Sequence, residues 1–255
     1  MSPHSPNGGT AIAVRNLVKR YGPVTAVDDL TFAVPKGSIT ALLGGNGAGK
    51  TTTLAILLGV LLPTSGAAEV LGVDILKHRY RVLPRMNFGS PYVELPKRLT
   101  VRENLGVFAR LYGVRNPKQR IEALSHELQM GEFIGRPTGT LSAGQKTRAA
   151  LAKALVNEPE VLLLDEPTAS LDPDTGDWVR AYLERYVAER KATILLASHN
   201  MSEVERMASF VLMMKAGKLV DRGTAAELLK KYGRENLEEV FLDIARNRRK
   251  AEPVT

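Results

Sequence analysis

Four short segments contain the residues whose types and spacing could perform chemistry. They are GGNGAGKTT at 44–52, LSAGQ at 141–145, VLLLDEPT at 161–168, and a lone His199 after TILLAS. Glycines beside a lysine and threonines suit a polyphosphate, because successive backbone N–H groups can curl around the anion and the lysine can neutralise it. Adjacent carboxylates after an apolar run suit Mg²⁺ binding and the activation of water. The segments together predict nucleotide chemistry.

The first segment fits the Walker A pattern, Gly44-x-x-x-x-Gly49-Lys50-Thr51, and follows an apolar strand at 39–43. That order of strand, loop and helix is the context that the pattern requires, and it makes a chance glycine-rich turn the weaker interpretation. We expect Lys50 to reach the β- and γ-phosphates. The hydroxyl of Thr51 should hold Mg²⁺, and Thr52 can add a phosphate hydrogen bond.

The third segment matches Walker B. Asp165 at the end of a buried strand can bind Mg²⁺. Glu166 is one position later in an extended chain, so its side chain should project elsewhere. It can therefore orient or deprotonate the attacking water. The alternative is a pair of solvated loop carboxylates.

The second segment decides between kinds of nucleotide-binding protein. LSAGQ could simply start a helix, because Ser142 can cap it and Gln145 occupies the capping-box position. A helix N-terminus carrying Ser142 and Gly144 is also suited to bind a phosphate group. The two interpretations are compatible.

With its four motifs in this order, the chain resembles the nucleotide-binding domain of ABC transporters over about residues 12–222. The resemblance implies that LSAGQ contacts the γ-phosphate held by the opposite subunit, so that two chains complete two ATP sites. It assigns catalysis to Glu166, His199 and Lys50, and Mg²⁺ binding to Thr51 and Asp165. The residues that it assigns to nucleotide contact are Tyr21, Gly44, Gly45, Asn46, Gly47, Ala48, Gly49, Lys50, Thr51, Thr52, Ser142, Gly144, Gln145 and Asp172.

Three of these assignments have specific roles in the family. Tyr21 matches the aromatic residue that stacks on adenine, although a single tyrosine could equally belong to the core. His199 matches the switch histidine that hydrogen-bonds the γ-phosphate, although a single histidine is usually structural. Asp172 matches the loop aspartate that communicates between the two sites.

The sequence departs from the family pattern at two places. Ala143 replaces the commoner first glycine of the signature, a change that we expect to be tolerated. Family members also usually carry a glutamine before the helical lobe. That glutamine approaches Mg²⁺ and the attacking water, and it links the site to the membrane partner. An ungapped match places Pro91 at that position, and Ser90 and Glu94 are the candidate replacements.

The pattern of apolar segments predicts an α/β fold: a P-loop NTPase core with a mixed sheet, an antiparallel β subdomain and an inserted helical lobe. Short strands are expected at 12–18, 30–34 and 39–43, parallel strands at 161–164 and 193–197, and two more at 210–214 and 218–221. Asn236 should cap a closing helix that packs on its own domain. We expect a disordered tail at 1–9, an ABC ATPase domain at 10–235 with its helical lobe at about 90–156, and a C-terminal helix and tail at 236–255.

Composition narrows the location of the protein. It has no cysteine, 44% apolar residues and 24% charged residues. The longest apolar stretch, 54–62, is about half the length that a bilayer span needs, and the N-terminus lacks the pattern of a secretory signal. We therefore expect a protein that does not itself cross a membrane, and the family resemblance implies a cytoplasmic location, peripheral on the inner face of the cell membrane.

The net charge of +8 is unevenly distributed. Residues 77–120 contain eleven lysines and arginines against two glutamates, Glu94 and Glu103. This segment is either a solvated helical surface or a face for an anionic partner, such as lipid headgroups or acidic protein loops.

The favoured function is the ATP-binding subunit of a transporter, most like ABC-2 type exporters, acting as a homodimer, or as a pair with a similar ATPase chain, on separate transmembrane permease subunits. Two other functions stay open. The basic composition, with a pI near 9.7, would suit a soluble ABC ATPase acting on nucleic acid or the ribosome, although we expect no nucleic-acid partner. The missing glutamine would suit an ATP-binding regulator with little turnover.

Overall fold

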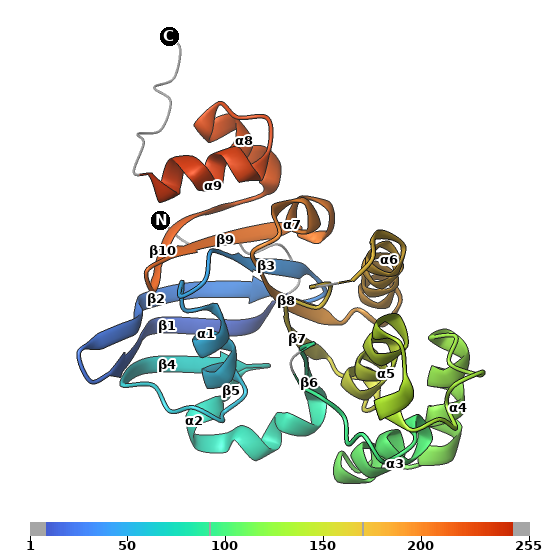
Figure 1. Ribbon diagram of the computed structural model, residues 1–255. Helices are drawn as coiled ribbons and strands as arrows, with labels where there is room; N and C mark the ends of the chain where they lie inside the picture. Colours follow the sequence, from blue (N-terminus) through green and yellow to red (C-terminus); the bar gives the residue numbers. More distant parts are fainter. Residues whose placement is uncertain (1–8, 92, 170, 247–255) are drawn as a thin grey trace.

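The computed structural model describes residues 9–91, 93–169 and 171–246 (Figure 1). The ends of the N- and C-terminal tails expected from the sequence therefore lie outside the described residues. Within these ranges the strands form two sheets. No described helix is long and apolar enough to span a bilayer.

The larger sheet has six strands and is parallel except at one edge. In pairing order its strands are β10 (Lys218–Gly223), β9 (Phe210–Lys215), β3 (Ile39–Leu43), β8 (Thr193–Ser198), β7 (Val161–Asp165) and β6 (Met86–Gly89). Strands β7 and β8 are the apolar runs that the sequence predicts to be parallel and buried, and they are so. Strand β3, which is expected only as a short strand, is also parallel and buried. Because β7 and β8 are neighbours, the residues that follow them meet at one edge of the sheet.

The smaller sheet is antiparallel and has the order β2-β1-β4-β5. Its strands are β1 (Thr10–Tyr21), β2 (Val24–Pro35), β4 (Ser65–Val70) and β5 (Val73–Asp74). The segments expected at 12–18 and 30–34 belong to it, but the paired strands extend well beyond those limits. Irregular register at several points lets the long β1–β2 hairpin bend.

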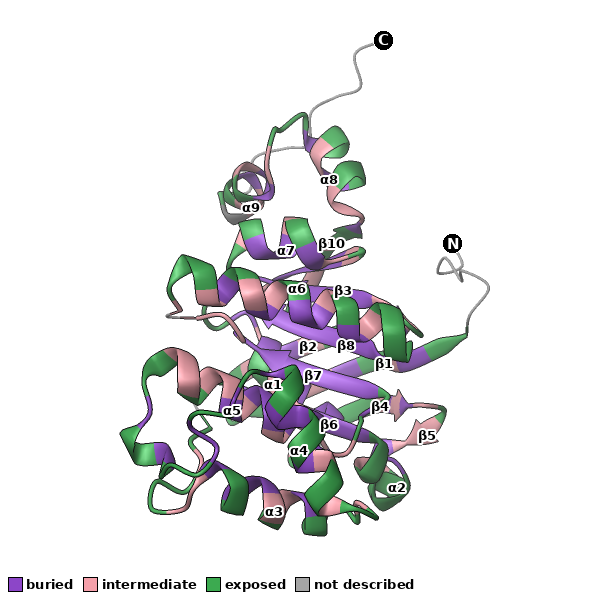
Figure 2. Ribbon diagram, turned by 90° about the vertical axis from the view of Figure 1, so that its right-hand side faces the viewer, coloured by how far each residue is buried: buried purple, intermediate pink, exposed green. Residues whose placement is uncertain are grey.

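The helices are α1 (Lys50–Leu57), α2 (Ile75–His78), α3 (Val101–Leu111), α4 (Pro117–Glu127), α5 (Ala143–Leu155), α6 (Pro173–Arg190), α7 (Met201–Met207), α8 (Ala225–Tyr232) and α9 (Leu237–Ala245). Figure 2 shows buried strands enclosed by helices whose outer faces are exposed. Alternate residues of β8 face opposite layers, as a strand requires. Ile194 and Leu196 pack with α3, α5 and α6, whereas Leu195 and Ala197 pack with α1 and the antiparallel sheet.

The helix caps predicted at Ser142 and Asn236 are confirmed, and α3 has a cap of the same kind. Thr100 and Glu103 form a complete capping box on α3, and Ser142 and Gln145 form one on α5. The Asn236 side chain accepts a hydrogen bond from the backbone of Glu239 at the start of α9. The apolar face of α9 packs against α7, α8, β3 and β9, so the closing helix is part of its own domain, as expected.

Candidate functional site

The loop between β3 and α1 is shaped by its glycines. Gly47 and Gly49 have positive φ angles of 75° and 98°, which other residues rarely adopt. A Cβ on Gly49 would also lie 2.5 Å from the carbonyl oxygen of Ala26 in β2. Helix α1 then begins at Lys50 with no side-chain cap and no acidic residue in its first turn. Its first N–H groups can therefore serve an anion.

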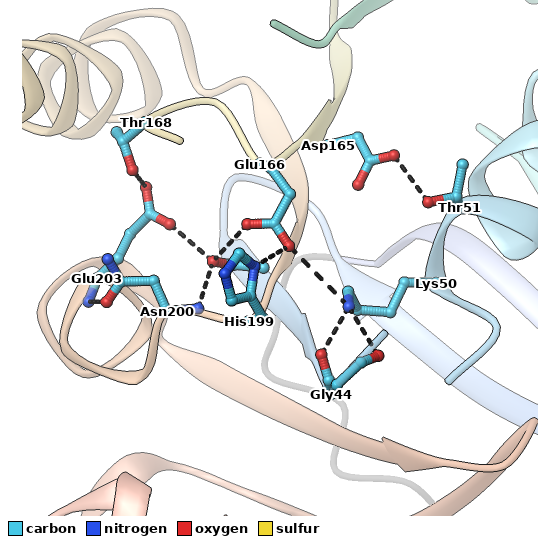
Figure 3. A network of polar contacts seen from close by, with 11 residues as sticks. Gly44, Lys50, Thr51, Asp165, Glu166, Thr168, His199, Asn200 and Glu203 are labelled. Atoms are coloured by element: carbon cyan, nitrogen blue, oxygen red, sulfur yellow. Dashed lines mark hydrogen bonds and ion pairs between the residues drawn. The ribbon is translucent and has the colours of Figure 1, made fainter. Parts of the chain in front are cut away.

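Lys50 is buried and folded back onto this loop. Its Nζ donates hydrogen bonds to the carbonyl oxygens of Gly44 at 2.6 Å and Gly45 at 3.2 Å, and lies 4.0 Å from Oε1 of Glu166 (Figure 3). Burial lowers the pKa of Lys50, while the nearby charges of Glu166 and Asp165 oppose that shift. The site thus holds a desolvated cation next to the helix N-terminus.

Asp165, the last residue of β7, faces α1. Its Oδ2 accepts a hydrogen bond of 2.9 Å from the Oγ1 of Thr51. Burial raises the pKa of Asp165, the Thr51 hydrogen bond lowers it, and the neighbouring Glu166 raises it further, so the net shift is upward. Two oxygen groups from different elements therefore converge on one point beside the loop.

Glu166 leaves the strand in a left-handed conformation, with φ 53°. A non-glycine residue in this region is uncommon, and such strain is often found at functional sites. The turn directs Glu166 away from Asp165, as the sequence predicts, and toward the end of β8. There its Oε1 lies 2.7 Å from Nδ1 of His199. Because a carboxylate can only accept, Nδ1 must carry the hydrogen.

The polar network continues to a residue that the motif analysis did not identify. Glu203, in the first turn of α7, accepts hydrogen bonds from Thr168 at 2.6 Å and Ser198 at 2.8 Å. Its side chain is buried. The four-residue spacing from His199 was the one sequence signal that could have placed it near the site.

Tyr21 ends strand β1 and is about half exposed, at 49%. The Nζ of Lys19 lies 4.9 Å from the centre of its ring. The core interpretation of Tyr21 is therefore wrong. The ring is a solvent-accessible aromatic surface on the hairpin whose second strand passes the glycine-rich loop at Ala26.

The LSAGQ segment lies away from the glycine-rich loop of its own chain. Figure 1 shows α5, which begins with this segment, well to one side of α1, with strands β6 and β7 between them. A Cβ on Gly144 would lie 3.3 Å from Oγ1 of Thr175 in α6. Asp172 caps α6 by accepting a hydrogen bond from the backbone of Thr175, and this bond lowers its pKa. The structure thus brings the signature close to the segment of Asp172.

The loop that lacks the family glutamine follows β6. Ser90 is buried immediately after Gly89, which pairs with Leu164 of β7, so Ser90 lies near the strand end that carries Asp165. Glu94 is exposed and forms an ion pair of 2.8 Å with Lys97. Of the two candidate replacements, Ser90 is the one that the strand order brings toward Asp165.

Comparison with known proteins agrees with this geometry. The sequence model of the family described as "ABC transporter" matches residues 27–169, more than half of the chain. The chain belongs to the ABC transporter family.

Several relatives within this family match most of the chain. The ABC transporter ATP-binding protein NatA of Bacillus subtilis is 36% identical over 223 residues, covering 86% of this chain and 90% of NatA. The bacitracin transport ATP-binding protein BcrA of Bacillus licheniformis is 38% identical over 232 residues, covering 90% of this chain and 74% of BcrA. The chain is thus an ATP-binding subunit of an ABC transporter, and an ATPase.

Solved structures give the same result for the ABC fold. The structure described as that of an ATP binding subunit of an ABC transporter has a TM-score of 0.82 and 25% identity, covering 92% of this chain and all of that one. CbiO1 from Clostridium perfringens, part of a cbiONQ complex, has a TM-score of 0.77 and 26% identity, covering 93% and 97%. The predicted fold class is therefore confirmed.

The residues of this ABC subunit fit ATP. The uncapped N-terminus of α1, the positive-φ glycines and the buried cation of Lys50 form a cradle for a polyphosphate. The carboxylates of Asp165 and Glu166 lie at the first turn of α1, beside Thr51 and Lys50.

Proposed function

We propose that two copies of this chain close on ATP and drive export through separate membrane subunits. The observation that carries the proposal is the separation, within one chain, of the glycine-rich loop from the LSAGQ segment. A lone chain offers a phosphate cradle on one side and an unused helix N-terminus on another. A head-to-tail pair with two-fold symmetry completes two sites from these halves.

Each half-site residue has a role consistent with its position. Gly44, Gly45, Asn46, Gly47, Ala48, Gly49 and Thr52 belong to the loop and first helical turn around the phosphates. Lys50 neutralises their charge, and Tyr21 stacks on the adenine. From the second chain, Ser142, Gly144 and Gln145 supply the N-terminus of α5, and Asp172 lies beside them at the start of α6.

Thr51 and Asp165 are suited to hold Mg²⁺. Their oxygens already lie 2.9 Å apart, and both are ligands that Mg²⁺ prefers. The described residues include no group of three or more histidine, cysteine or acidic side chains that could hold a metal ion by itself. That fits Mg²⁺, which is usually held by one or two carboxylates together with phosphate oxygens.

Hydrolysis needs a base, an oriented water and charge neutralisation. Bound ATP supplies the phosphoanhydride bond that water cleaves. Glu166 orients the attacking water and accepts its proton. His199 and Lys50, which both lie beside Glu166 Oε1, supply hydrogen-bond donors for the developing negative charge. With Ser90 and Pro91 in place of the family glutamine, we expect slow turnover.

One surface of the chain is suited to meet the membrane subunits. The four most exposed large apolar side chains in the described ranges are Val60, Leu62, Tyr80 and Leu111, each at least 65% exposed. Val60 and Leu62 follow α1, Tyr80 follows α2, and Leu111 is the last residue of α3. Figures 1 and 2 both place α2 and α3 at the lower end of the molecule, opposite α8 and α9. We propose that these exposed apolar side chains contribute to an interaction site.

The basic residues reinforce this choice of surface. Several cations of the 77–120 segment are paired with acidic residues, as Arg85 is with Glu160. The following exposed cations have no acidic partner in the part of the chain that the structure describes: Arg79, Arg81, Arg98, Arg110, Arg115 and Lys118. We therefore assign this face to the permease and the adjacent inner surface of the cell membrane.

A hollow lies beside the loop that lacks the glutamine. It has a volume of about 220 Å³ and is lined by Pro91, Leu95, Ala143, Lys146 and Leu171, among others. These residues come from the loop without glutamine, the start of α5 and the segment after Walker B. A permease element seated there would touch all three. The name of one relative, the Nod factor export ATP-binding protein I of Ralstonia nicotianae, favours export as the direction.

Purification of the chain with the products of neighbouring genes tests the proposal. We expect a membrane protein with about six apolar spans of roughly 20 residues to copurify. ATPase activity should be slow, require Mg²⁺ and disappear with EDTA. Steeply salt-dependent binding to duplex DNA, with ATPase activity stimulated by DNA, would contradict transport and favour a nucleic-acid role. Stable ATP binding without hydrolysis would favour a regulator.

A further inference from the structure

We infer that Glu203 is a positioning residue that couples the subunit-contact segment to the catalytic Glu166. The inference rests on the proposed function, because it concerns the same hydrolytic site. Glu203 itself is placed to touch neither nucleotide nor water. It acts through the hydroxyl groups of Thr168 and Ser198.

Glu203 is a buried carboxylate without a cation. It is 2% exposed, and in the described residues no lysine, arginine or histidine pairs with it. Burying a charge in this way is costly unless it is well hydrogen-bonded. The start of α7 and the cap by Asn200 offset part of that cost, since a helix N-terminus favours negative charge. A residue needed only to fill space would not require a carboxylate.

Each oxygen of Glu203 accepts from a different segment. Oε1 accepts from Thr168, which is two residues after Glu166 and four before Asp172. Oε2 accepts from Ser198, the last residue of β8 and the neighbour of His199. One side chain thus joins the two segments that leave neighbouring strands β7 and β8 (Figure 3).

The Ser198 hydroxyl has one hydrogen and two carboxylates within reach. Its Oγ lies 2.8 Å from Glu203 and 3.5 Å from Oε2 of Glu166. Since the shorter contact is the stronger hydrogen bond, Glu203 takes this hydrogen and leaves Oε2 of Glu166 available as a base. Loss of the Glu203 acceptor would turn the hydroxyl toward Glu166, and a hydrogen bond would then occupy Oε2 of that carboxylate.

The network also connects Glu166 to the proposed subunit contact. Backbone hydrogen bonds from Ala169 to Glu166, and from Leu171 to Thr168, form the turn that leads to Asp172. On dimer closure, a shift of Asp172 would move Thr168. Glu203 would transmit that movement to Ser198. The hydrogen bonding and orientation of the Glu166 carboxylate would then depend on whether the two subunits are closed.

Steady-state ATPase kinetics of Glu203→Gln test the inference, with Glu205→Gln as the matched control on the same helix. Glu205 accepts a hydrogen bond from the backbone of Leu237 and does not belong to the network. We expect Glu203→Gln to lower kcat about tenfold with KM for ATP nearly unchanged, because a misplaced base costs rate rather than affinity. Glu205→Gln should leave both kcat and KM as in the wild type.

Thr168 gives a second test. Thr168→Val removes the hydroxyl and should lower kcat, whereas Thr168→Ser keeps it and should restore most of the rate. Combined with Glu203→Gln, Thr168→Val should add little further loss, since both remove one interaction. Unchanged kcat in a folded Glu203→Gln chain would overturn this inference but not the proposed function. Equal effects of Glu203→Gln and Glu205→Gln would do the same. A wild-type chain without hydrolysis would instead overturn the proposed function.

Discussion

His199 and Glu166 are joined through their side chains, with Nδ1 of the histidine 2.7 Å from Oε1 of the glutamate. The same oxygen lies 4.0 Å from Nζ of Lys50. The groups assigned to the phosphates are thus held close to the group assigned to water. The residues proposed for catalysis thus come together from three elements that are distant in sequence.

Replacement of Glu166 by glutamine should abolish hydrolysis while ATP still binds. Glutamine keeps the shape of the side chain but cannot accept the proton of the attacking water. We expect kcat to fall by about 10² to 10⁴. Phosphate release by the purified chain measures this effect, with Glu238→Gln on the exposed face of α9 as the control. Hydrolysis at the wild-type rate would show that Glu166 is not the base.

Replacement of Lys50 by alanine should weaken ATP binding about tenfold or more, because charge-assisted hydrogen bonds to phosphate are lost. Titration with a fluorescent ATP analogue gives the affinity. Lys230→Ala is the matched control, since Lys230 is an exposed lysine of α8. Equal affinity for the two variants would remove Lys50 from the phosphate site.

Replacement of Gly144 by aspartate should block subunit closure without weakening ATP binding to one chain. The added carboxylate would repel the phosphate presented by the opposite subunit. We expect wild-type affinity for the ATP analogue, but no ATPase activity. A chain that loses ATP binding as well would place the signature at its own phosphate site, contrary to the proposal.

Asp221 provides a prediction about stability and pH. Burial raises the pKa of Asp221, but hydrogen bonds from Lys231 and Tyr232, with the charge of Lys231, lower it by more. A lowered pKa in the folded state means that the ionised side chain stabilises the fold at pH values above its ordinary pKa of about 4. This contribution is lost as the pH falls and the carboxylate becomes protonated.

Asp221→Asn should therefore lower the free energy of unfolding by about 1–3 kcal/mol at pH 7. The deficit should persist to about pH 5 and narrow at lower pH, as the wild-type chain loses the same charge. Urea titrations at pH 7, 5 and 4 measure it. A deficit that stays constant below pH 5 would show that the charge of Asp221 is not its source.

Local sequence signals were sufficient for much of the fold. The buried parallel strands β3, β7 and β8 are continuous apolar runs, and the caps at Thr100 and Ser142 depend on residues only three positions apart. These features are decided within a few residues of sequence. The positions of the candidate site residues followed from the motifs because each motif ends a strand or begins a helix.

Other features depend on contacts that are distant in sequence. Strand β6 has only two apolar residues, Met86 and Phe88, and it forms because it pairs with β7. The role of Glu203 could not be predicted, because its burial depends on how α7 packs beside Thr168 and Ser198. The contact of Lys50 with its own loop likewise depends on the curvature of that loop.

The mass of the Glu166→Gln chain in solution tests the central claim most directly. Sedimentation should give a single chain of 27.8 kDa without nucleotide, and about twice that mass with saturating ATP and Mg²⁺. Adding Gly144→Asp to the same chain should keep it monomeric with ATP. A Glu166→Gln chain that stays monomeric with ATP bound, or that dimerises equally without ATP, would contradict the account.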